Sequence, residues 1–289
     1  MRLDQYVAQF WPEYSRSTWQ KYIAAGYVQV NGEVITSVKL ELDEDDEVSV
    51  HVPSEPDYSE HELPVVYEDE YVVVINKPAG VLTHAKGEVS EEFTVADFVR
   101  ARMTQPDTTN RPGIVHRLDR ATSGIMICAK DNETKSKLQK QFQDRKAHKT
   151  YLAVVRGTPK QPAATLDLPI ERNPKKPSTH RIGINGKHAL TRYEVVASNS
   201  KYSVVRMYPE TGRTHQLRVH MAYIGTPIVG DRLYGSEKSP IGRLCLHAEQ
   251  LEITIPISKR ETFYANPPAD FKEFMTQIEN GYTIPSFRY

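Results

Sequence analysis

The sequence has few features of a secreted or membrane protein. It contains only two cysteines in 289 residues, Cys128 and Cys245, and both lie in apolar segments typical of strands. We therefore expect free thiols in a reducing compartment and no disulfide. The longest apolar stretches, such as YVVVIN and GIMICA, are far shorter than the ~20 residues that cross a bilayer. The opening MRLDQYVAQFWPEY lacks the apolar core of a signal peptide. These absences predict a cytoplasmic protein with no membrane partner.

The sequence also lacks a net charge, because 37 Lys and Arg residues balance 37 Asp and Glu residues. The charges are nevertheless segregated along the chain. Residues 41–70 contain 13 acidic residues and no Lys or Arg, whereas residues 111–192 contain 18 Lys and Arg against 6 Asp and Glu, a net charge of +12. Local potential steers a charged partner more than the total charge does. This pattern favours a polyanion bound at one face, with ordinary solvated surface charge as the alternative.

The first 52 residues are predicted to form a small α/β domain. LDQYVAQF (3–10) has apolar residues at helical spacing, and TWQKYIAA (18–25) is a second amphipathic segment. YVQVNGEVI alternates around Asn31-Gly32, which is a strong signal for a two-residue hairpin turn. Residues 53–62 contain prolines and no periodicity and are predicted to be a linker. A second, larger domain is expected over residues 63–289.

The larger domain is predicted to be mostly strands. Helices are expected at TVADFVRARM, ETKSKLQKQFQD and THQLRVHMAYI. Runs rich in β-branched and aromatic residues predict strands at YVVVIN, GIVHRL, SGIMICAK, YLAVVRG, ALTRYEVV, YSVVRMY and LEITIPI. Because these strands do not alternate strictly with helices, the fold class is α+β, with a mixed, mostly antiparallel sheet flanked by helices and loops.

The stretch HRLDRATSG (116–124) places one carboxylate between two arginines. Asp119 is expected to follow the strand GIVHRL in a turn, where the flanking strands would aim it rigidly. A carboxylate beside Arg117 and Arg120 is expected to be ionised at neutral pH, which suits a nucleophile or a base. The alternative is an aspartate that caps its own turn while the arginines remain solvated.

Two further motifs carry candidate binding groups. In GRTHQLRVH (212–220), Arg213 is placed at a strand-to-helix junction, where a catalytic role and a phosphate-positioning or structural role are equally open. In AHKTYLAVVRG, Tyr151 follows a basic turn, an arrangement that can stack a base while cations hold phosphates. A buried strand tyrosine is the alternative there.

The histidines do not predict a metal site. His215 and His220 are five residues apart, whereas ligands on one helical face need a spacing of three or four. Convergence of His84, His116 and His247 in space remains open at this point.

The stretches NKPAGVLTHA, GIVHRLDRATSGIMICAK, KTYLAVVRG, GRTHQLRVHM and LCLHA, in this order across residues 62–257, resemble RluA-type pseudouridine synthases. Residues 1–52 are similar to the small RNA-binding domain shared by a small-subunit ribosomal protein and tyrosyl-tRNA synthetase. The matching stretches there are RLDQYV, SRS, IAAGYVQVNG and DEVSV. The second resemblance implies that Arg2, Arg16 and Lys21 face RNA.

The first resemblance implies a role for each matching residue. Asp119 corresponds to the essential aspartate, and Tyr151 to the tyrosine that stacks on the flipped base and helps to remove the proton from carbon 5. Arg213 corresponds to the basic residue that pairs with the aspartate. The predicted substrate-binding residues of this domain are His116, Arg117, Lys149, Arg218 and Leu246, the last as an aliphatic floor to the pocket.

The activity implied is isomerisation of specific uridines in RNA to pseudouridine, with large-subunit ribosomal RNA as the expected substrate. The target base must leave its stack to react. No cofactor is implied, and a monomer is expected. Transfer RNA as substrate and a non-catalytic RNA-binding ribosome-assembly factor are the alternatives. The sequence leaves open whether the aspartate attacks the sugar or removes a proton from it.

Overall fold

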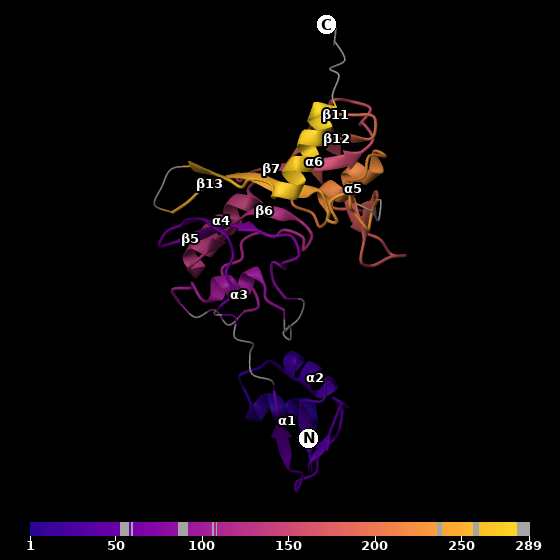
Figure 1. Cartoon of the computed structure of the whole chain (residues 1–289). Coiled ribbons are helices and arrows are strands. Elements are labelled where there is room, and N and C mark those ends of the chain that lie inside the picture. Colours follow the sequence, from indigo (N-terminus) through magenta and orange to yellow (C-terminus); the bar gives the residue numbers. More distant parts are fainter. Residues whose placement is uncertain are drawn as a thin grey trace. The chain divides into compact units, whose positions relative to one another are not determined.

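The computed structural model describes residues 1–52, 58, 60–85, 92–105, 107, 109–235, 239–256 and 260–281. These residues form two compact units (Figure 1), one within residues 1–52 and the other from Tyr58 onward. Residues 53–57 and 59 of the predicted linker lie outside the described residues. No helix in the described ranges is long and apolar enough to cross a membrane.

The smaller unit packs two helices against a three-stranded antiparallel sheet of order β2-β1-β3. Its elements are α1 (Leu3–Phe10), α2 (Arg16–Ala24), β1 (Val28–Val30), β2 (Glu33–Val34) and β3 (Val48–Val50). Asn31 and Gly32 both have positive φ, 53° and 80°, as a two-residue turn between twisted strands requires. The predicted hairpin and the helix at 3–10 are therefore confirmed. Leu3 and Val7 of α1 pack with Trp19 of α2 in the core of this unit.

The larger unit is built on a nine-stranded sheet. The strand order is β4-β5-β6-β13-β7-β12-β11-β8, with β14 paired to β13. The strands are β4 (Val65–Glu68), β5 (Val72–Lys77), β6 (Ser123–Ala129), β7 (His148–Arg156), β8 (Ala163–Asp167), β11 (Leu190–Ser198), β12 (Tyr202–Pro209), β13 (Leu246–Thr254) and β14 (Arg260–Tyr264). Only β6 and β13 pair in parallel within this described sheet. The expected α+β class with a mixed, mostly antiparallel sheet is confirmed.

Helices and a separate ribbon complete the larger unit. The ribbon pairs β9 (Ile170–Arg172) with β10 (His180–Ile182). The helices are α3 (Val95–Arg100), α4 (Asn132–Gln143), α5 (Gln216–Tyr223) and α6 (Ala269–Asn280). Helix α4 contacts β6, and α6 contacts β11 and β12 (Figure 1). Helix α6 was not among the predicted helices.

The segment before β6 differs from the prediction. GIVHRL was expected to be a strand, but residues 113–118 form only an isolated bridge, between Ile114 and Cys128. The cause is local, because Gly113 has a φ of 60° and departs from extended backbone. The chain therefore approaches β6 as a loop. Asp119 stands at the end of that loop, and the carbonyl of Asp119 accepts a hydrogen bond from the N–H of Thr122 at 3.0 Å.

Candidate active site

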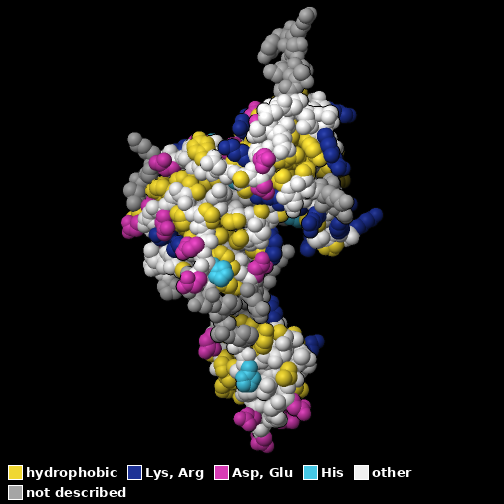
Figure 2. Space-filling model, viewed as in Figure 1, with side chains coloured by type: hydrophobic (Ala, Val, Ile, Leu, Met, Phe, Trp, Pro, Cys, Tyr) yellow, Lys and Arg dark blue, Asp and Glu magenta, His cyan; other side chains and the backbone are white. Residues whose placement is uncertain are grey.

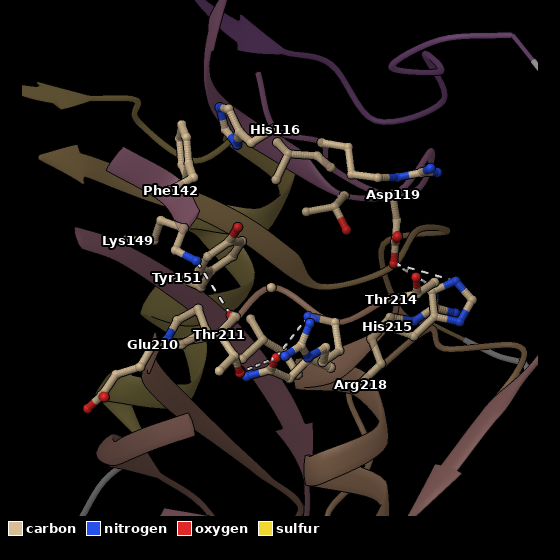
Figure 3. A pocket seen from close by; sticks show the side chains of 18 of the residues that line it. His116, Asp119, Phe142, Lys149, Tyr151, Glu210, Thr211, Thr214, His215 and Arg218 are labelled. Atoms are coloured by element: carbon tan, nitrogen blue, oxygen red, sulfur yellow. Dashed lines mark hydrogen bonds and ion pairs between the residues drawn. The ribbon is translucent and has the colours of Figure 1, made fainter. Parts of the chain in front are cut away.

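A cavity of about 530 Å³ opens in the larger unit (Figure 3). Its wall comes from the loop before β6, the end of α4, the start of β7, the end of β12, the loop before α5, the first turn of α5 and the first residue of β13. The structure brings together all the site residues predicted in this unit, namely His116, Arg117, Asp119, Lys149, Tyr151, Arg213, Arg218 and Leu246. The other predicted residues, Arg2, Arg16 and Lys21, belong to the smaller unit.

A buried lysine holds the loop that carries Asp119 in place. Lys77, the last residue of β5, donates hydrogen bonds to the carbonyls of Pro78 and Val81 at 2.8 Å and of Arg120 at 3.3 Å. The N–H of Gly80 also donates to the Arg120 carbonyl, at 2.8 Å. The NKPAG turn thus holds the residue next to Asp119. Burial lowers the pKa of Lys77 to about 7, although the nearby Asp119 charge opposes that shift.

Arg218, in the first turn of α5, links the cavity carboxylate to a buried one. One guanidinium nitrogen, Nη1, donates to Oδ2 of Asp119 at 3.0 Å. The other two, Nε and Nη2, grip Asp231 at 2.7 and 2.8 Å. The Asp119 side chain is 20% exposed, that of Arg218 is 8% exposed and that of Asp231 is fully buried. Burial alone would lower the pKa of Arg218, but the two aspartates outweigh it and raise that pKa. Arg218 thus holds the Asp119 carboxylate at the wall of the cavity.

Arg213 does not pair with Asp119, which corrects the prediction. Its Nε instead donates to the carbonyl of His188 at 2.9 Å. Arg213 lies before α5 begins, where its backbone N–H donates to the side chain of Gln216 at 3.0 Å. That bond fixes the entry into the helix, and Arg218, inside the first turn, is the arginine presented to the carboxylate. Arg213 still borders the cavity.

His215 adds a second contact to Asp119. It is the N-cap residue of α5 and has a φ of 57°, a left-handed conformation that is uncommon for residues other than glycine. Its Nε2 lies 3.8 Å from Oδ2 of Asp119, and its Nδ1 lies 2.8 Å from the hydroxyl of Tyr234. That hydroxyl accepts a hydrogen bond from the backbone N–H of His180 at 2.7 Å. Burial lowers the pKa of His215, and the ring is therefore neutral at neutral pH.

Sequence reasoning missed the residues behind the carboxylate. Asp231 and Tyr234 follow Gly230, which has a φ of 78°. The sequence of that stretch indicates only a turn and does not mark either residue as part of a site. Asp231 binds Arg218, and the ring of Tyr234 lies 5.2 Å from the centre of the same guanidinium. Their place beside the site follows from the fold and not from a motif that the sequence displays.

Tyr151 and Leu246 form an apolar part of the wall. Tyr151 enters from β7, on a different side of the cavity from Asp119 (Figure 3). Burial, together with the charge of Asp119, raises the pKa of the Tyr151 phenol, so the phenol is protonated at neutral pH. Leu246 is buried at the start of β13, where it pairs with Ala153 of β7. A planar base would find an aromatic ring and an aliphatic side chain here.

The part of the wall beside Tyr151 combines aromatic rings with a cation (Figure 3). The rings of His116 and Phe142 are stacked with centroids 4.5 Å apart and planes 19° from parallel. Nε2 of His116 accepts a hydrogen bond from the N–H of Ile127 at 3.1 Å, and burial lowers the pKa of His116 to about 3, so this ring is neutral. Burial lowers the pKa of Lys149 to about 8. Phe142, at the end of α4, was not predicted as a site residue.

His84, His247 and the two cysteines do not line the cavity. Among the described residues, no group of three or more His, Cys, Asp or Glu side chains is placed to hold a metal ion. Cys128 and Cys245 are both free and buried, as expected.

Comparison with known proteins identifies the family of this chain. Residues 71–223 match the family described as RNA pseudouridylate synthase, and residues 1–48 match the S4 domain. The chain belongs to the RNA pseudouridylate synthase family. It is thus an isomerase, an RNA pseudouridine synthase, with an N-terminal S4 domain, and the resemblance noted in the sequence is confirmed.

Relatives of the synthase cover most of its length. An uncharacterized RNA pseudouridine synthase of Aquifex aeolicus is 38% identical over 83% of this chain and 78% of its own. The ribosomal large subunit pseudouridine synthase D of Haemophilus influenzae is 34% identical over 97% of this chain and 92% of its own. A solved structure, human RNA pseudouridylate synthase domain containing 1, is 27% identical and superposes with a TM-score of 0.61, over 77% of this chain and 88% of its own.

Proposed function

We propose that this synthase converts specific uridines of large-subunit ribosomal RNA to pseudouridine, acting in the cytoplasm as a monomer. The observation that carries the proposal is the Asp119 carboxylate, open to the cavity, held by Arg218 and sharing the cavity with Tyr151. The choice of RNA is supported by the names of relatives such as the Haemophilus influenzae protein, which match over nearly the full chain.

The reaction needs an anion at the ribose. The bond from uracil nitrogen 1 to ribose carbon 1′ breaks, the base rotates, and carbon 5 bonds to carbon 1′. The proton on carbon 5 then leaves, and nitrogen 1 takes one up. Attack at carbon 1′ and removal of the carbon 2′ proton both need an ionised carboxylate facing the sugar. We assign that role to Asp119, with Arg218 holding its position. The reaction involves no redox change and no loss of a group, and the proposed chemistry therefore uses no cofactor.

The uracil must leave its stack to reach this carboxylate, at a cost of a few kcal/mol. We propose that the Tyr151 ring stacks on the extruded base and that Leu246 supports its other side. Because the phenol is protonated in the free enzyme, Tyr151 would act in the carbon 5 proton transfer only after RNA has changed its surroundings. We assign three further cavity residues, His116, Arg117 and Lys149, to the RNA strand beside the target.

The smaller unit offers a second contact with RNA. Asp4 is fully buried and accepts hydrogen bonds from Arg2 at 3.1 Å and from Arg16 at 2.9 Å, which fixes both guanidinium groups. We propose that Arg2, Arg16 and Lys21 bind phosphates of folded RNA outside the target nucleotide. This would let one domain choose the RNA while the other performs the chemistry.

Mapping pseudouridine in RNA from a strain that lacks this protein tests the substrate. We expect one or a few large-subunit positions to be unmodified in that strain and to be restored by the wild-type gene. Loss confined to transfer RNA would contradict the ribosomal assignment and support the transfer RNA alternative. An unchanged map in both RNAs would contradict both.

A further inference from the structure

The β9–β10 ribbon and the two turns around it form a strongly basic segment, defined here as the basic arm (residues 171–188). It carries one acidic residue, Glu171, whose carboxylate pairs with Arg181 at 2.7 Å. The arm contains three lysines, Lys175, Lys176 and Lys187. In the part of the chain that the structure describes, no carboxylate lies within ion-pair distance of them. The exposed cations of the arm are Arg172, Lys175, Lys176, Arg181 and Lys187. Figure 2 shows Lys and Arg side chains gathered on the right of the larger unit, beside a hollow.

The basic arm is bonded at two points to residues at the cavity, through β10 and through the segment that follows it. In β10, the N–H of His180 donates to the Tyr234 hydroxyl, and the His180 ring stands edge-on to His215 at 5.6 Å. After β10, the carbonyl of His188 accepts the hydrogen bond from Arg213. Arg213 and His215 both border the cavity. The arm is therefore fixed at the rim of the site.

The turn that follows β10 presents an apolar side chain to solvent. Residues Gly183 to Gly186 form a tight turn, closed by a hydrogen bond from the Gly186 N–H to the Gly183 carbonyl at 2.9 Å. The turn lies close against the first strand, because a Cβ on Gly186 would come within 2.6 Å of the Ile170 backbone. Ile184, in this turn, is 96% exposed, whereas the other large apolar side chains described are at most 61% exposed. Turns usually carry polar residues at such positions.

We propose that the basic arm is an RNA-binding element of the synthase. Lys175, Lys176 and Lys187 bind phosphates of the strand that leaves the cavity, and Ile184 packs against a base next to the target. Cations that hold a backbone and an apolar wedge that contacts or unstacks bases are a known combination in nucleic-acid binding. The inference rests on the proposed function, since it requires RNA in the cavity.

Steady-state tritium release tests the charge of the arm. The substrate is carbon-5-tritiated ribosomal RNA from a strain lacking the synthase, and every variant is the full chain. For Lys175→Gln with Lys176→Gln we expect KM to rise about 5- to 20-fold with kcat within about twofold, and the salt dependence of binding to become shallower by about 1 to 2 in log–log slope. Lys160→Gln with Lys201→Gln is the matched control, because these exposed lysines flank the ends of β8 and β11 farthest from the arm. The control is expected to match wild type.

Ile184 is tested separately. Ile184→Asn removes the apolar contact and is expected to raise KM about 3- to 10-fold, while Ile184→Leu keeps it and restores the wild-type value. Val196→Asn, a half-exposed position on β11, is the matched control. If wild type releases tritium and both arm variants behave like their controls, the basic arm does not bind RNA. If wild type releases none, the proposed function fails first, and this inference fails with it.

Discussion

The guanidinium of Arg218 joins two aspartates, with one hydrogen bond to Asp119 at 3.0 Å and two to Asp231 at 2.7 and 2.8 Å. Nε and Nη2 of the planar guanidinium bind the buried carboxylate of Asp231, and Nη1 positions the carboxylate of Asp119, which faces the cavity. A lysine could not satisfy both partners with this geometry. The position of Asp119 therefore depends on a residue 99 positions away in sequence.

Replacement of Arg218 by lysine should disable catalysis more than any change at Arg213. Because lysine lacks the fork, we expect Arg218→Lys to lower kcat about 100-fold or more. Arg213→Gln leaves the Asp119 contact in place and should change kcat less than about 10-fold, with its main effect on KM. Tritium release under saturating RNA measures both. A larger loss of kcat in the Arg213 variant than in the Arg218 variant would show that catalysis does not depend on the ion pair between Arg218 and Asp119.

Two substitutions of Tyr151 should separate its contribution to base stacking from its contribution to proton transfer. Tyr151→Phe keeps the ring, and we expect its RNA affinity to stay within about threefold of wild type while turnover falls strongly. Tyr151→Ala also loses the stacking surface, which contributes about 1–3 kcal/mol per base and corresponds to roughly 5- to 150-fold weaker binding. Filter binding and single-turnover tritium release distinguish the two effects. Full turnover by the Phe variant would exclude a role for the hydroxyl.

Lys77 should make stability depend on pH. Burial lowers its pKa to about 7, whereas an unfolded lysine titrates near about 10.4. Between these values the unfolded chain binds a proton that the folded chain lacks, so this lysine makes the free energy of unfolding rise with pH. Lys77→Met lacks this contribution. From pH 7 to pH 9, the free energy of unfolding of wild type should rise relative to the variant by about 2 kcal/mol, as measured by urea denaturation. Parallel pH profiles would contradict the lowered pKa of Lys77.

Charges on the smaller unit should control affinity and not chemistry. Arg16→Gln with Lys21→Gln is expected to weaken binding of ribosomal RNA about 10-fold at fixed salt and to reduce the salt slope by about 1 to 2, with kcat nearly unchanged. Lys160→Gln with Lys201→Gln provides the same loss of charge on the larger unit. Equal affinities for the two double variants would remove the RNA-binding role of Arg16 and Lys21.

Local features of the fold could be predicted where the signal lies within a few residues. The helix at 3–10 and the Asn31-Gly32 turn follow from apolar spacing and from the positive φ that such a turn requires. Asp119 does stand in a turn before β6. Helix α6 also has a local signal, because Phe271, Phe274, Met275 and Ile278 recur at helical spacing and are buried.

The contacts of the carboxylate could not be predicted in the same way. The motif GRTHQLRVH contains both Arg213 and Arg218, and the sequence alone does not show which of them faces Asp119. That depends on where α5 begins, because Arg218 lies in its first turn and Arg213 lies before it. Asp231 and Tyr234 have no local pattern that marks them as its supporting residues. The exposure of Ile184 likewise depends on how the ribbon turns at the rim, which the sequence does not display.

Tritium release from carbon-5-tritiated ribosomal RNA by wild type and by Asp119→Asn decides whether Asp119 is the reacting carboxylate. The asparagine keeps the shape of the side chain but cannot act as an anion at the ribose. We expect wild type to release tritium, and the variant to release none while it folds and binds RNA like wild type. Release by the Asp119→Asn variant at the wild-type rate would contradict the assignment of Asp119 as the reacting carboxylate.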